Sequence, residues 1–512
     1  MNFALFLELK ARSEPDSLAL ADHRLRLSWR ELDACASQLA HLLVLRGLGP
    51  ADRMAVYLPN RVEAVIALLG CMKAGVVAVP LNWRLSGDEL HRVLAHCDAA
   101  VLLTTDDRAT ALARQTGSCE VLEVATSAMQ GSFWRAIGNH GTNFRAVGCQ
   151  ASDVASLLYT SGTTSAPKAA IHTHGMRVAI AAAMADSFAL TSRDVALAVS
   201  PLFHTSGLSV FSNALFAGCP LILLEKWDLD HFVRVVADEG ITFMHLIGTL
   251  LVDIAKAPEQ AFAPLRSNSR MRFTWGGGHS IHPDSFLAYE ERIGGTFLLG
   301  YSRTEGGLTY NPLDREARRF DHHGLPNRNS SDLAVIDAAT RLRCPQGEVG
   351  EICFRGDGVS PGYWEGSFVR VVPPYEGGWQ PTGDLGFIDA QGCLHFLGRS
   401  DNMMKSGGEN VFPDEVVKVL LAMPQVADAV VLGLPDERMG ERVAAVIVRG
   451  DETLRSSEIE TACRAALAAY KIPRVLAFTN ALPRLGSGKV DLAACRDLLL
   501  AEGSAGRPGV QG

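Results

Sequence analysis

Short apolar segments alternate with amphipathic segments along the first two-thirds of the 512-residue chain. Four apolar runs have the length of buried strands: Met54–Leu58, Val76–Pro80, Ala100–Thr104 and Val154–Leu158. Between such runs apolar residues recur at helical spacing, as in Val62–Met72. Buried strands separated by helices predict an α/β fold with mostly parallel sheets covered by helices.

Two helix starts carry a capping box. Ser28 precedes Glu31 by three residues, and Ser86 precedes Glu89 by three. In this arrangement the serine side chain accepts from a free amide of the first turn, and the glutamate bonds back to the serine amide. The pattern predicts helices that begin after Ser28, where the run ends at Gly47, and after Ser86.

The pattern changes after about residue 400 to a small unit with shorter spacing. Helices are predicted near Pro413–Leu421 and Ile459–Ala469, and strands near Ala427–Leu432, Val443–Val448 and Val475–Thr479. We therefore expect a large N-terminal domain over residues 1–400 and a small α+β domain over residues 401–512. The tail from about Glu502 has a composition typical of disorder.

Composition narrows the classes of partner. The chain has 48 basic and 56 acidic residues, a net charge of −8, which argues against nucleic acid or an anionic membrane as the main partner. The longest apolar run, Leu208–Leu224, is interrupted by Asn213, Gly218 and Pro220, so it predicts a helix followed by a strand and not a membrane span. Eleven scattered cysteines without C-x-x-C spacing favour reduced thiols and a cytoplasmic location. The first ten residues contain Glu8 and do not resemble a secretory signal.

A loop rich in hydroxyl residues follows the strand at Val154–Leu158. Its sequence, YTSGTTSAPK, contains Thr160, Ser161, Gly162, Thr163, Thr164 and Lys168. Glycine permits successive N–H groups to point into one concavity, and the hydroxyls and the lysine add donors and charge. The loop is therefore predicted to hold a polyphosphate. A Walker A loop is the competing interpretation, but Pro167 and Ala169 stand where that motif has glycine and Ser or Thr.

Four further segments follow in a fixed order. They read GYSRTE at Gly300–Glu305, TGD at Thr382–Asp384, GRSD at Gly398–Asp401 with Lys405, SGGEN and Pro413 after it, and PRLGSGK at Pro483–Lys489. Together with the first loop, they resemble the adenylate-forming superfamily, which includes acyl- and aryl-CoA synthetases. The resemblance covers essentially the whole chain. It departs from the family at Ser165, Ser302, Leu485 and Leu492, where glycine, glycine, threonine and arginine are usual.

The resemblance implies a nucleotide site and its chemistry. A carboxylate attacks the α-phosphate of ATP to give acyl-AMP and pyrophosphate, which needs cations and N–H donors around the phosphates. Glu305 would bind Mg²⁺, Thr304 the α-phosphate and Asp384 the ribose. The implied ATP/AMP-binding residues are Thr160, Ser161, Gly162, Thr163, Thr164, Lys168, Gly276, Gly277, Gly278, Tyr301, Ser302, Asp384 and Arg399. Tyr301 would stack on adenine.

The C-terminal residues are implied in two half-reactions. Lys489 matches the catalytic lysine that bridges the carboxylate and the α-phosphate, and Asp401 matches the hinge about which the small domain rotates. The implied coenzyme A contacts are Gly407, Gly408, Tyr470, Lys471 and Arg474. For the last three of these, a helix end with favourable cations is an equally good interpretation.

The resemblance also implies which residues contact the acid, namely His204 and four residues between 276 and 307. His204 is implied to be a catalytic residue that lines the pocket. Amino-acid-activating relatives have an aspartate at this position, which pairs with the ammonium group of the substrate. A largely neutral imidazole does not attract an ammonium group, so we expect an acid without an α-amino group. The implied acyl-binding residues are His204, Gly276, Gly300, Arg303 and Gly307. Because relatives commonly carry larger side chains at the three glycines, we expect a bulky, mostly apolar acid. Arg303 could instead meet a carboxylate or a phosphate.

The predicted function is an AMP-forming acyl-CoA synthetase that uses ATP, Mg²⁺ and coenzyme A. The chain leaves no room for a downstream carrier domain, so free coenzyme A is the simplest acceptor. The alternatives are an acyl-AMP ligase that loads a carrier protein in trans, a luciferase-like adenylate oxygenase and a non-catalytic nucleotide-binding regulator. The expected partners are a small carboxylic acid and coenzyme A, with a homodimer kept as a candidate assembly.

Overall fold

The computed structural model describes residues 1–50, 52–105, 119–125, 127, 129–160, 168–265, 268–277, 283–366, 369–436, 438–484 and 490–505. The chain divides into two compact units. Unit 1 comprises Met1–Gly277, Leu287–Leu333 and Phe354–Gln380, and unit 2 comprises Gly278–Phe286, Ala334–Cys353 and Pro381–Gly512. The domain boundary at residue 400 and the hinge at Asp401 stay predictions.

Unit 1 contains a nine-stranded sheet with the order β15-β14-β13-β12-β11-β9-β10-β1-β2. Its strands are β1 (Leu18–Ala21), β2 (Arg26–Ser28), β9 (Ala196–Ala198), β10 (Leu221–Leu223), β11 (Phe243–Ile247), β12 (Phe273–Gly277), β13 (Thr296–Ser302), β14 (Leu308–Tyr310) and β15 (Leu325–Pro326). The strands from β13 to β1 pair in parallel, whereas β14, β15 and β2 add antiparallel pairs at the two edges.

A second sheet of unit 1 has the order β19-β18-β8-β7-β4-β3-β5-β6. Its strands are β3 (Arg53–Tyr57), β4 (Val77–Pro80), β5 (Val101–Thr105), β6 (Glu120–Val124), β7 (Val154–Thr160), β8 (Lys168–Thr173), β18 (Tyr363–Trp364) and β19 (Val369–Arg370). The strands from β7 to β6 are parallel, and β8, β18 and β19 continue the sheet with antiparallel pairs. The predicted strands of the N-terminal region are therefore confirmed within one or two residues.

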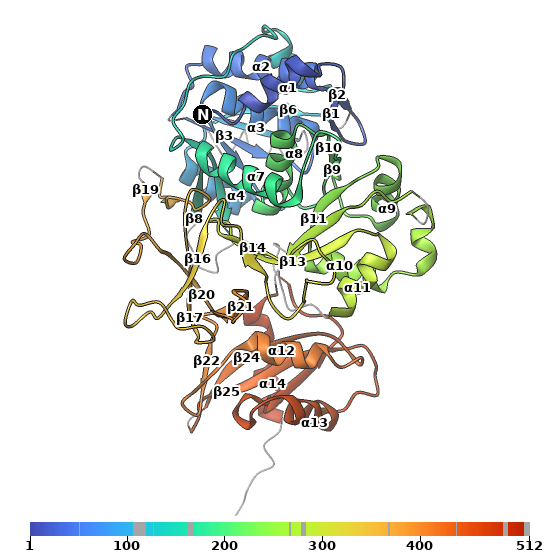
Figure 1. The fold of residues 1–512 in the computed structure, drawn as a ribbon, viewed down its shortest axis with the longest axis vertical. Helices are drawn as coiled ribbons and strands as arrows, with labels where there is room; N and C mark the ends of the chain where they lie inside the picture. Colours follow the sequence, from blue (N-terminus) through green and yellow to red (C-terminus); the bar gives the residue numbers. More distant parts are fainter. Residues whose placement is uncertain are drawn as a thin grey trace, which may run out of the picture. The chain divides into compact units, whose positions relative to one another are not determined.

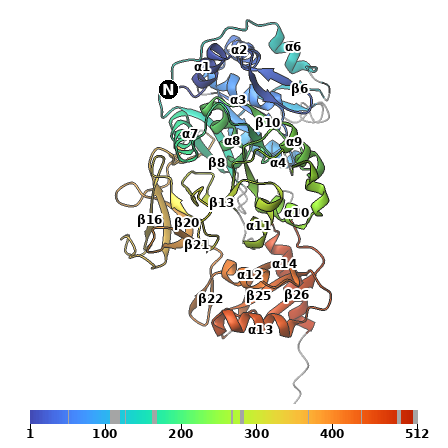
Figure 2. The same ribbon diagram turned by 45° about the vertical axis from the view of Figure 1, so that its right-hand side comes forward.

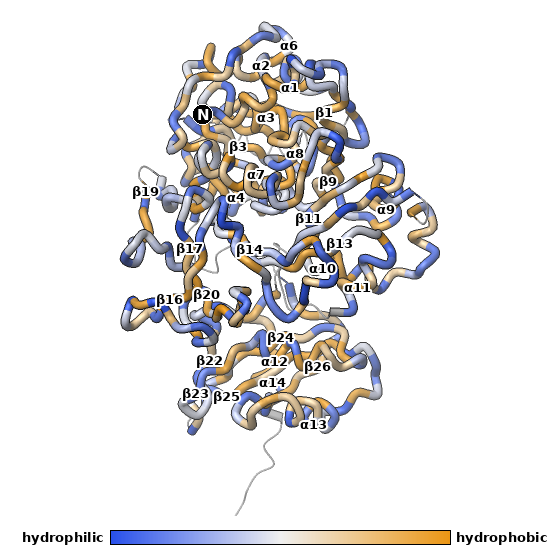
Figure 3. The backbone as a smooth tube through the Cα atoms, viewed as in Figure 1, coloured by the Kyte–Doolittle hydropathy of each residue, from blue (hydrophilic) through white to orange (hydrophobic). Residues whose placement is uncertain are grey.

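Helices cover the sheets of unit 1. They are α1 (Leu5–Ser13), α2 (Trp29–Leu45), α3 (Val62–Ala74), α4 (Gly87–Cys97), α6 (Ser132–Gly138), α7 (His174–Phe188), α8 (Thr205–Ala217), α9 (Leu229–Asp238), α10 (Gly248–Lys256) and the 3-10 helix η1 (Glu259–Leu265), and α11 (Pro283–Arg292) has residues of both units. Both predicted capping boxes are present, at α2 and α4. Every residue of α3 is buried. The helix has a mostly apolar trace in Figure 3 and packs against α2 (Figure 1).

A four-stranded sheet with the order β16-β17-β20-β21 follows in the chain and belongs mainly to unit 2. Its strands are β16 (Asp332–Ile336), β17 (Gly350–Arg355), β20 (Gln380–Ile388) and β21 (Leu394–Arg399). The hydrophobic pattern did not predict it. The TGD segment lies on β20 and the GRSD segment begins at the end of β21, and these two strands pair in antiparallel orientation.

The rest of unit 2 is an α+β sandwich. Its elements are β22 (Met404–Ser406), β23 (Glu409–Val411), α12 (Pro413–Leu421), β24 (Val426–Asp436), β25 (Gly440–Arg449), α13 (Ser456–Ala466), the 3-10 helix η2 (Ala469–Lys471), β26 (Val475–Thr479) and α14 (Leu492–Ala505). Alternate residues of β25 enter two cores. Val443, Ala445 and Ile447 pack with residues of α12 and α13, whereas Ala444 and Val446 pack with Leu499 of α14. Figure 2 shows these helices around β25 and β26.

The fold class is confirmed as a large α/β region followed by a small α+β region. The C-terminal tail needs a correction, because helix α14 continues through Glu502 to Ala505; residues 506–512 lie outside the described residues. Among the helices of the described residues, none combines the length and apolar character that crossing a bilayer requires.

Candidate active site

Thr304 and Glu305 lie directly after β13, where the chain turns toward β14. The Tyr363 hydroxyl donates a hydrogen bond to Glu305 Oε1 at 2.5 Å, and Arg303 Nη2 lies 3.2 Å from Glu305 Oε2. The Glu305 carbonyl accepts from the Ser360 amide at 2.8 Å. A hydroxyl and a guanidinium group thus contact the carboxylate that the sequence assigned to Mg²⁺, and the Ser360 amide fixes the backbone of the same residue.

The carbonyl of Thr304 accepts a hydrogen bond from His172 Nε2–H at 2.7 Å. Burial lowers the pKa of His172 to about 3, and the nearby Arg177 guanidinium contributes to this shift. Burial likewise lowers the pKa of Arg177 to about 9. Arg177 donates to the hydroxyls of Ser156 and Ser212 at 2.5 and 3.2 Å. His172 is therefore neutral at physiological pH, so a donating Nε2–H requires a deprotonated Nδ1.

The predicted phosphate loop connects two antiparallel strands. Thr160 at the end of β7 pairs with Lys168 at the start of β8, so both ends of the loop lie at one point of the sheet. Ser161, Gly162, Thr163 and Thr164 fall outside the described residues. The strand that the sequence predicted before the loop is confirmed, and contact of the loop with phosphate stays a prediction.

The residues assigned to adenine occupy the neighbouring strands β12 and β13. Tyr301 is 7% exposed, and its ring stacks on Phe354 with centroids 5.9 Å apart. One face of the ring is thus covered, so adenine could stack only on the other. Gly277 ends β12, Ser302 ends β13 and is exposed, and Gly278 lies outside the described residues.

The steric argument drawn from Gly276, Gly300 and Gly307 is wrong. A Cβ on Gly276 would lie 2.3 Å from the Leu246 carbonyl oxygen, and a Cβ on Gly300 would lie 2.3 Å from the Thr309 carbonyl oxygen. Gly307 has φ +82° and faces the Phe354 ring, which a Cβ would approach to 2.5 Å. The backbone fills the positions where side chains would stand, so these glycines permit close strand and loop packing and do not enlarge a pocket.

A small cavity lies among several predicted acyl-site residues. Its volume is about 30 Å³, and its lining includes Thr205, His245, Trp275, Ser302, Arg303 and Gly307. This volume is on the order of one water molecule, smaller than an aromatic ring. A bulky acid would therefore have to displace side chains of the described wall.

His204 is the N-cap residue of α8 and is exposed, with its ring packed 4.6 Å from that of Phe203. The sequence analysis missed His245, which is 7% exposed, lines the cavity and lies 3.2 Å from the Ser200 hydroxyl. Burial lowers the pKa of His245 to about 4, with a contribution from His204. A histidine inside the apolar run of β11 was the signal that could have indicated it.

In unit 2 the structure brings Asp384 and Arg399 together. They are direct partners on β20 and β21, and Arg399 Nη1 donates to Asp384 Oδ1 at 3.1 Å. Arg399 Nε also donates to Asp401 Oδ1 at 3.3 Å. Asp384 is 6% exposed, which makes it a buried carboxylate with a cationic partner.

The residues assigned to coenzyme A form two groups in unit 2. Gly407 and Gly408 make the turn between β22 and β23 with φ of +63° and +87°, a conformation that favours glycine. Lys471 Nζ donates to both oxygens of Glu415 at 2.7 Å and lies 5.7 Å from the Tyr470 ring centroid. Arg474 donates to the Ala469 carbonyl at 3.3 Å. Lys471 thus has a structural carboxylate partner, and its contact with coenzyme A stays a prediction.

Lys489 lies outside the described residues. The described residues on either side of it, Arg484 and Val490, pair in an antiparallel bridge. The catalytic role of Lys489 stays a prediction.

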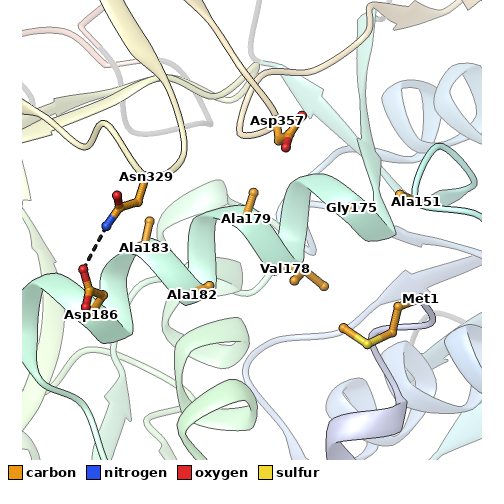
Figure 4. Close-up of a pocket in the computed structure, with 10 residues that line it drawn as sticks. All are labelled: Met1, Ala151, Gly175, Val178, Ala179, Ala182, Ala183, Asp186, Asn329 and Asp357. Atoms are coloured by element: carbon orange, nitrogen blue, oxygen red, sulfur yellow. Dashed lines mark hydrogen bonds between the residues drawn. The ribbon is translucent and has the colours of Figure 1, made fainter.

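A larger hollow of about 480 Å³ runs along α7. Figure 4 shows its small apolar floor of Val178, Ala179 and Ala182, and the Asp186 side chain that points toward Asn329 at one end. The Asn329 amide donates to Asp186 Oδ2 at 2.8 Å. Of the predicted site residues that the structure describes, none lines this hollow.

The described residues contain no group of three or more His, Cys, Asp or Glu side chains that could enclose a metal ion. Mg²⁺ in nucleotide sites is usually held by one or two carboxylates together with substrate phosphates. Glu305, whose side chain is 19% exposed beside the Thr304 backbone, fits that more modest requirement.

Comparisons with known proteins agree with the motifs. The AMP-binding enzyme family matches residues 7–364, and the AMP-binding enzyme C-terminal domain matches residues 415–489. A feruloyl-CoA synthase of Amycolatopsis sp is 33% identical over 485 residues, which cover 94% of this chain and 96% of the relative. A long-chain-fatty-acid–CoA ligase of Mycobacterium tuberculosis is 29% identical over 468 residues, with coverage of 91% and 92%.

A solved structure shows the same fold. The crystal structure of ATP-bound MatB from Rhodopseudomonas palustris has a TM-score of 0.86 and 29% identity, and the match covers 97% of this chain and 99% of that chain. The prediction of an adenylate-forming enzyme is therefore confirmed. The chain belongs to the AMP-binding enzyme family, and it is an acid–thiol ligase of the acyl-CoA synthetase type.

Proposed function

We propose that this ligase joins a carboxylic acid without an α-amino group to coenzyme A in two steps. In the first step the carboxylate attacks the α-phosphate of ATP, pyrophosphate leaves and acyl-AMP forms. In the second step the thiol attacks the acyl carbon, and AMP leaves. The observation that carries the proposal is the position of the Thr304–Glu305 pair. The Thr304 carbonyl accepts a hydrogen bond from His172 of β8, and β8 begins where the predicted phosphate loop ends.

The charges in this region suit the first step. Two anions must approach each other, so the phosphates need donors and cations. Lys168 stands at the exit of the loop, and Arg303 lies beside Glu305. We assign Mg²⁺ to Glu305, the α-phosphate to Thr304 and the ribose hydroxyls to the Asp384 carboxylate, with Arg399 assisting.

Different C-terminal residues serve the two steps in this proposal. Lys489 would bridge the substrate carboxylate and the α-phosphate during adenylation. A rotation of residues 401–512 about Asp401 would then bring the turn at Gly407 and Gly408 to the thiol channel. In that turn a Cβ on Gly408 would meet no atom within 4 Å, so the turn leaves space on one side.

The proposed acid is bulky and mostly apolar, on grounds other than the three glycines. Ile180, Met184, Trp275 and Leu308 give the small cavity apolar walls, and methionine is adaptable enough to move aside. Two relatives are named for feruloyl and long-chain fatty acyl groups. Arg303 lines the same cavity and favours a second candidate, an acid with an anionic distal group.

Thioester assays test the acceptor. Free coenzyme A and a holo-carrier protein are offered separately, together with ATP, Mg²⁺ and a panel of bulky and of anionic acids. Product with coenzyme A supports the proposal, whereas product only with the carrier supports an acyl-AMP ligase. Oxygen uptake or light with ATP would identify a luciferase-like oxygenase. The cytoplasmic location and the homodimer stay predictions.

A further inference from the structure

Two neighbouring strands of the eight-stranded sheet hold the Thr304–Glu305 pair from different sides. Tyr363 of β18 is the direct antiparallel partner of Ala170 of β8, and His172 lies two residues further along β8. His172 bonds the Thr304 carbonyl at 2.7 Å, and Tyr363 bonds Glu305 Oε1 at 2.5 Å. The backbone of the motif and its carboxylate are therefore fixed to the same piece of sheet.

The two oxygens of Glu305 have different kinds of partner. Oε1 accepts a hydrogen bond from the hydroxyl of Tyr363, whose ring is carried by strand β18. Oε2 faces the guanidinium group of Arg303, with Nη2 at 3.2 Å. The partner of Oε1 is thus a neutral hydroxyl, and the partner of Oε2 is a cation.

We propose that Tyr363 is a positioning residue for the metal-binding carboxylate, and that His172 fixes the backbone beside it. Tyr363 would retain Oε1, and Oε2, which faces the Arg303 cation, would be the oxygen that holds Mg²⁺ of the nucleotide. This inference rests on the proposed function, which assigns Mg²⁺ to Glu305. Loss of a group that orients a metal-ligating side chain typically weakens metal binding about 10- to 100-fold.

The test measures ATP binding by calorimetry over a series of Mg²⁺ concentrations, without any acid, so that no turnover occurs. Tyr363→Phe removes only the hydroxyl. We expect it to require at least about tenfold more Mg²⁺ for half of the Mg²⁺-dependent gain in ATP affinity. ATP binding in the presence of a chelator should equal that of the wild type.

Three further variants make the result specific. Tyr57→Phe is the matched control. Tyr57 lies on β3 of the same sheet, and its hydroxyl donates to the Leu85 carbonyl at 2.8 Å, so this variant also removes one buried hydroxyl. It should leave the Mg²⁺ dependence unchanged. His172→Leu should shift the dependence in the same direction as Tyr363→Phe. His172→Gln retains an N–H donor and should restore much of the wild-type behaviour.

Glu305→Gln separates failure of this inference from failure of the proposed function. If Glu305→Gln abolishes the Mg²⁺-dependent gain and Tyr363→Phe leaves it unchanged, Tyr363 is not a positioning residue. A lower melting temperature of Tyr363→Phe without a shift in Mg²⁺ dependence would overturn the inference in the same way. Wild-type Mg²⁺ dependence in Glu305→Gln would instead refute the assignment of the metal to Glu305. In the expected case, adding Tyr363→Phe to Glu305→Gln causes no further loss.

Discussion

Replacement of Asp384 by alanine tests the assignment of the ribose site. The Asp384 side chain is 8% exposed and faces Arg399 across β20 and β21, with Nη1 and Oδ1 3.1 Å apart. A carboxylate offers about four lone-pair directions, so it can accept from Arg399 and from two ribose hydroxyls at once. The alanine variant would lose all of these acceptors.

The expected loss of ATP affinity exceeds the expected loss of stability. A hydrogen bond to a charged group contributes about 1.5–3 kcal/mol, so losing two of them, with water compensating in part, should cost at least about 1.4 kcal/mol. That is about tenfold in the dissociation constant of ATP. Arg399 is 47% exposed, so loss of its ion pair with Asp384 should cost only about 0–1 kcal/mol of folding free energy.

The assay is calorimetric ATP binding combined with thermal unfolding of the same samples. Asp389→Ala is the control, because its carboxylate lies 2.8 Å from His395 Nε2 in the turn that joins the same two strands, and it also accepts from the amides of Gln391 and Cys393. We expect Asp389→Ala to lower the melting temperature at least as much as Asp384→Ala, and we expect a weaker ATP affinity only for Asp384→Ala. An unchanged ATP affinity in Asp384→Ala, or an equal loss in Asp389→Ala, would refute the ribose assignment.

Three further predictions address other parts of the account. Lys489→Ala should abolish acid-dependent pyrophosphate release yet preserve thioester formation from supplied acyl-AMP and coenzyme A; equal loss of both steps would contradict its single role. Gly276→Ala should destabilise unit 1 by about 1–3 kcal/mol in thermal unfolding, because its Cβ would lie 2.3 Å from a carbonyl oxygen. Gly138→Ala is the control and should be neutral, because a Cβ there meets no atom within 4 Å. Burial lowers the pKa of His172 from 6.5 to about 3 and that of His174 from 6.5 to about 4. Between about pH 4 and 6.5 the unfolded chain therefore binds more protons than the folded protein, so the free energy of unfolding rises with pH. The slope should approach about 1.4 kcal/mol per pH unit for each histidine and should be smaller in His172→Gln, and a wild-type slope in that variant would count against the buried neutral histidine.

The sequence predicted helix starts that depend on hydrogen bonds between residues close together in the chain. The capping boxes at Ser28 and Ser86 are present with both of their hydrogen bonds, because each joins residues only three positions apart. Helix α14 carried a comparable signal that was overlooked. The Asp491 carboxylate accepts from the amides of Ala493 and Ala494, and Cys495 and Leu499 recur at helical spacing and are fully buried.

Contacts between distant segments could not be predicted from the sequence. Tyr363 and Glu305 are 58 residues apart, and His172 and Thr304 are 132 apart, so only the pairing of β8 with β18 brings these partners together. The glycine argument failed for the same reason. The space beside Gly276 is occupied by the adjacent strand β11, whose position a motif does not contain.

The pair assigned to the ribose shows the opposite case. Asp384 and Arg399 were predicted from two separate motifs, and the structure places them at matching positions of adjacent strands. The sheet that carries these motifs was nevertheless missed, because strands β16 and β17 are separated from their partners by long connections with little periodicity. The motifs therefore selected two residues that the structure pairs, although the hydrophobic pattern did not predict the sheet that carries them, and the role of this pair at the ribose stays a prediction.

The central claim is that the chain joins a carboxylic acid to coenzyme A through an acyl adenylate. The most direct measurement follows pyrophosphate and AMP release across a library of carboxylic acids, with mass spectrometry of the products in the presence and absence of coenzyme A. The account predicts acid-dependent pyrophosphate release, and one AMP for each acyl-CoA once coenzyme A is present. Formation of ADP in place of AMP, or of acyl-CoA without pyrophosphate, would contradict it.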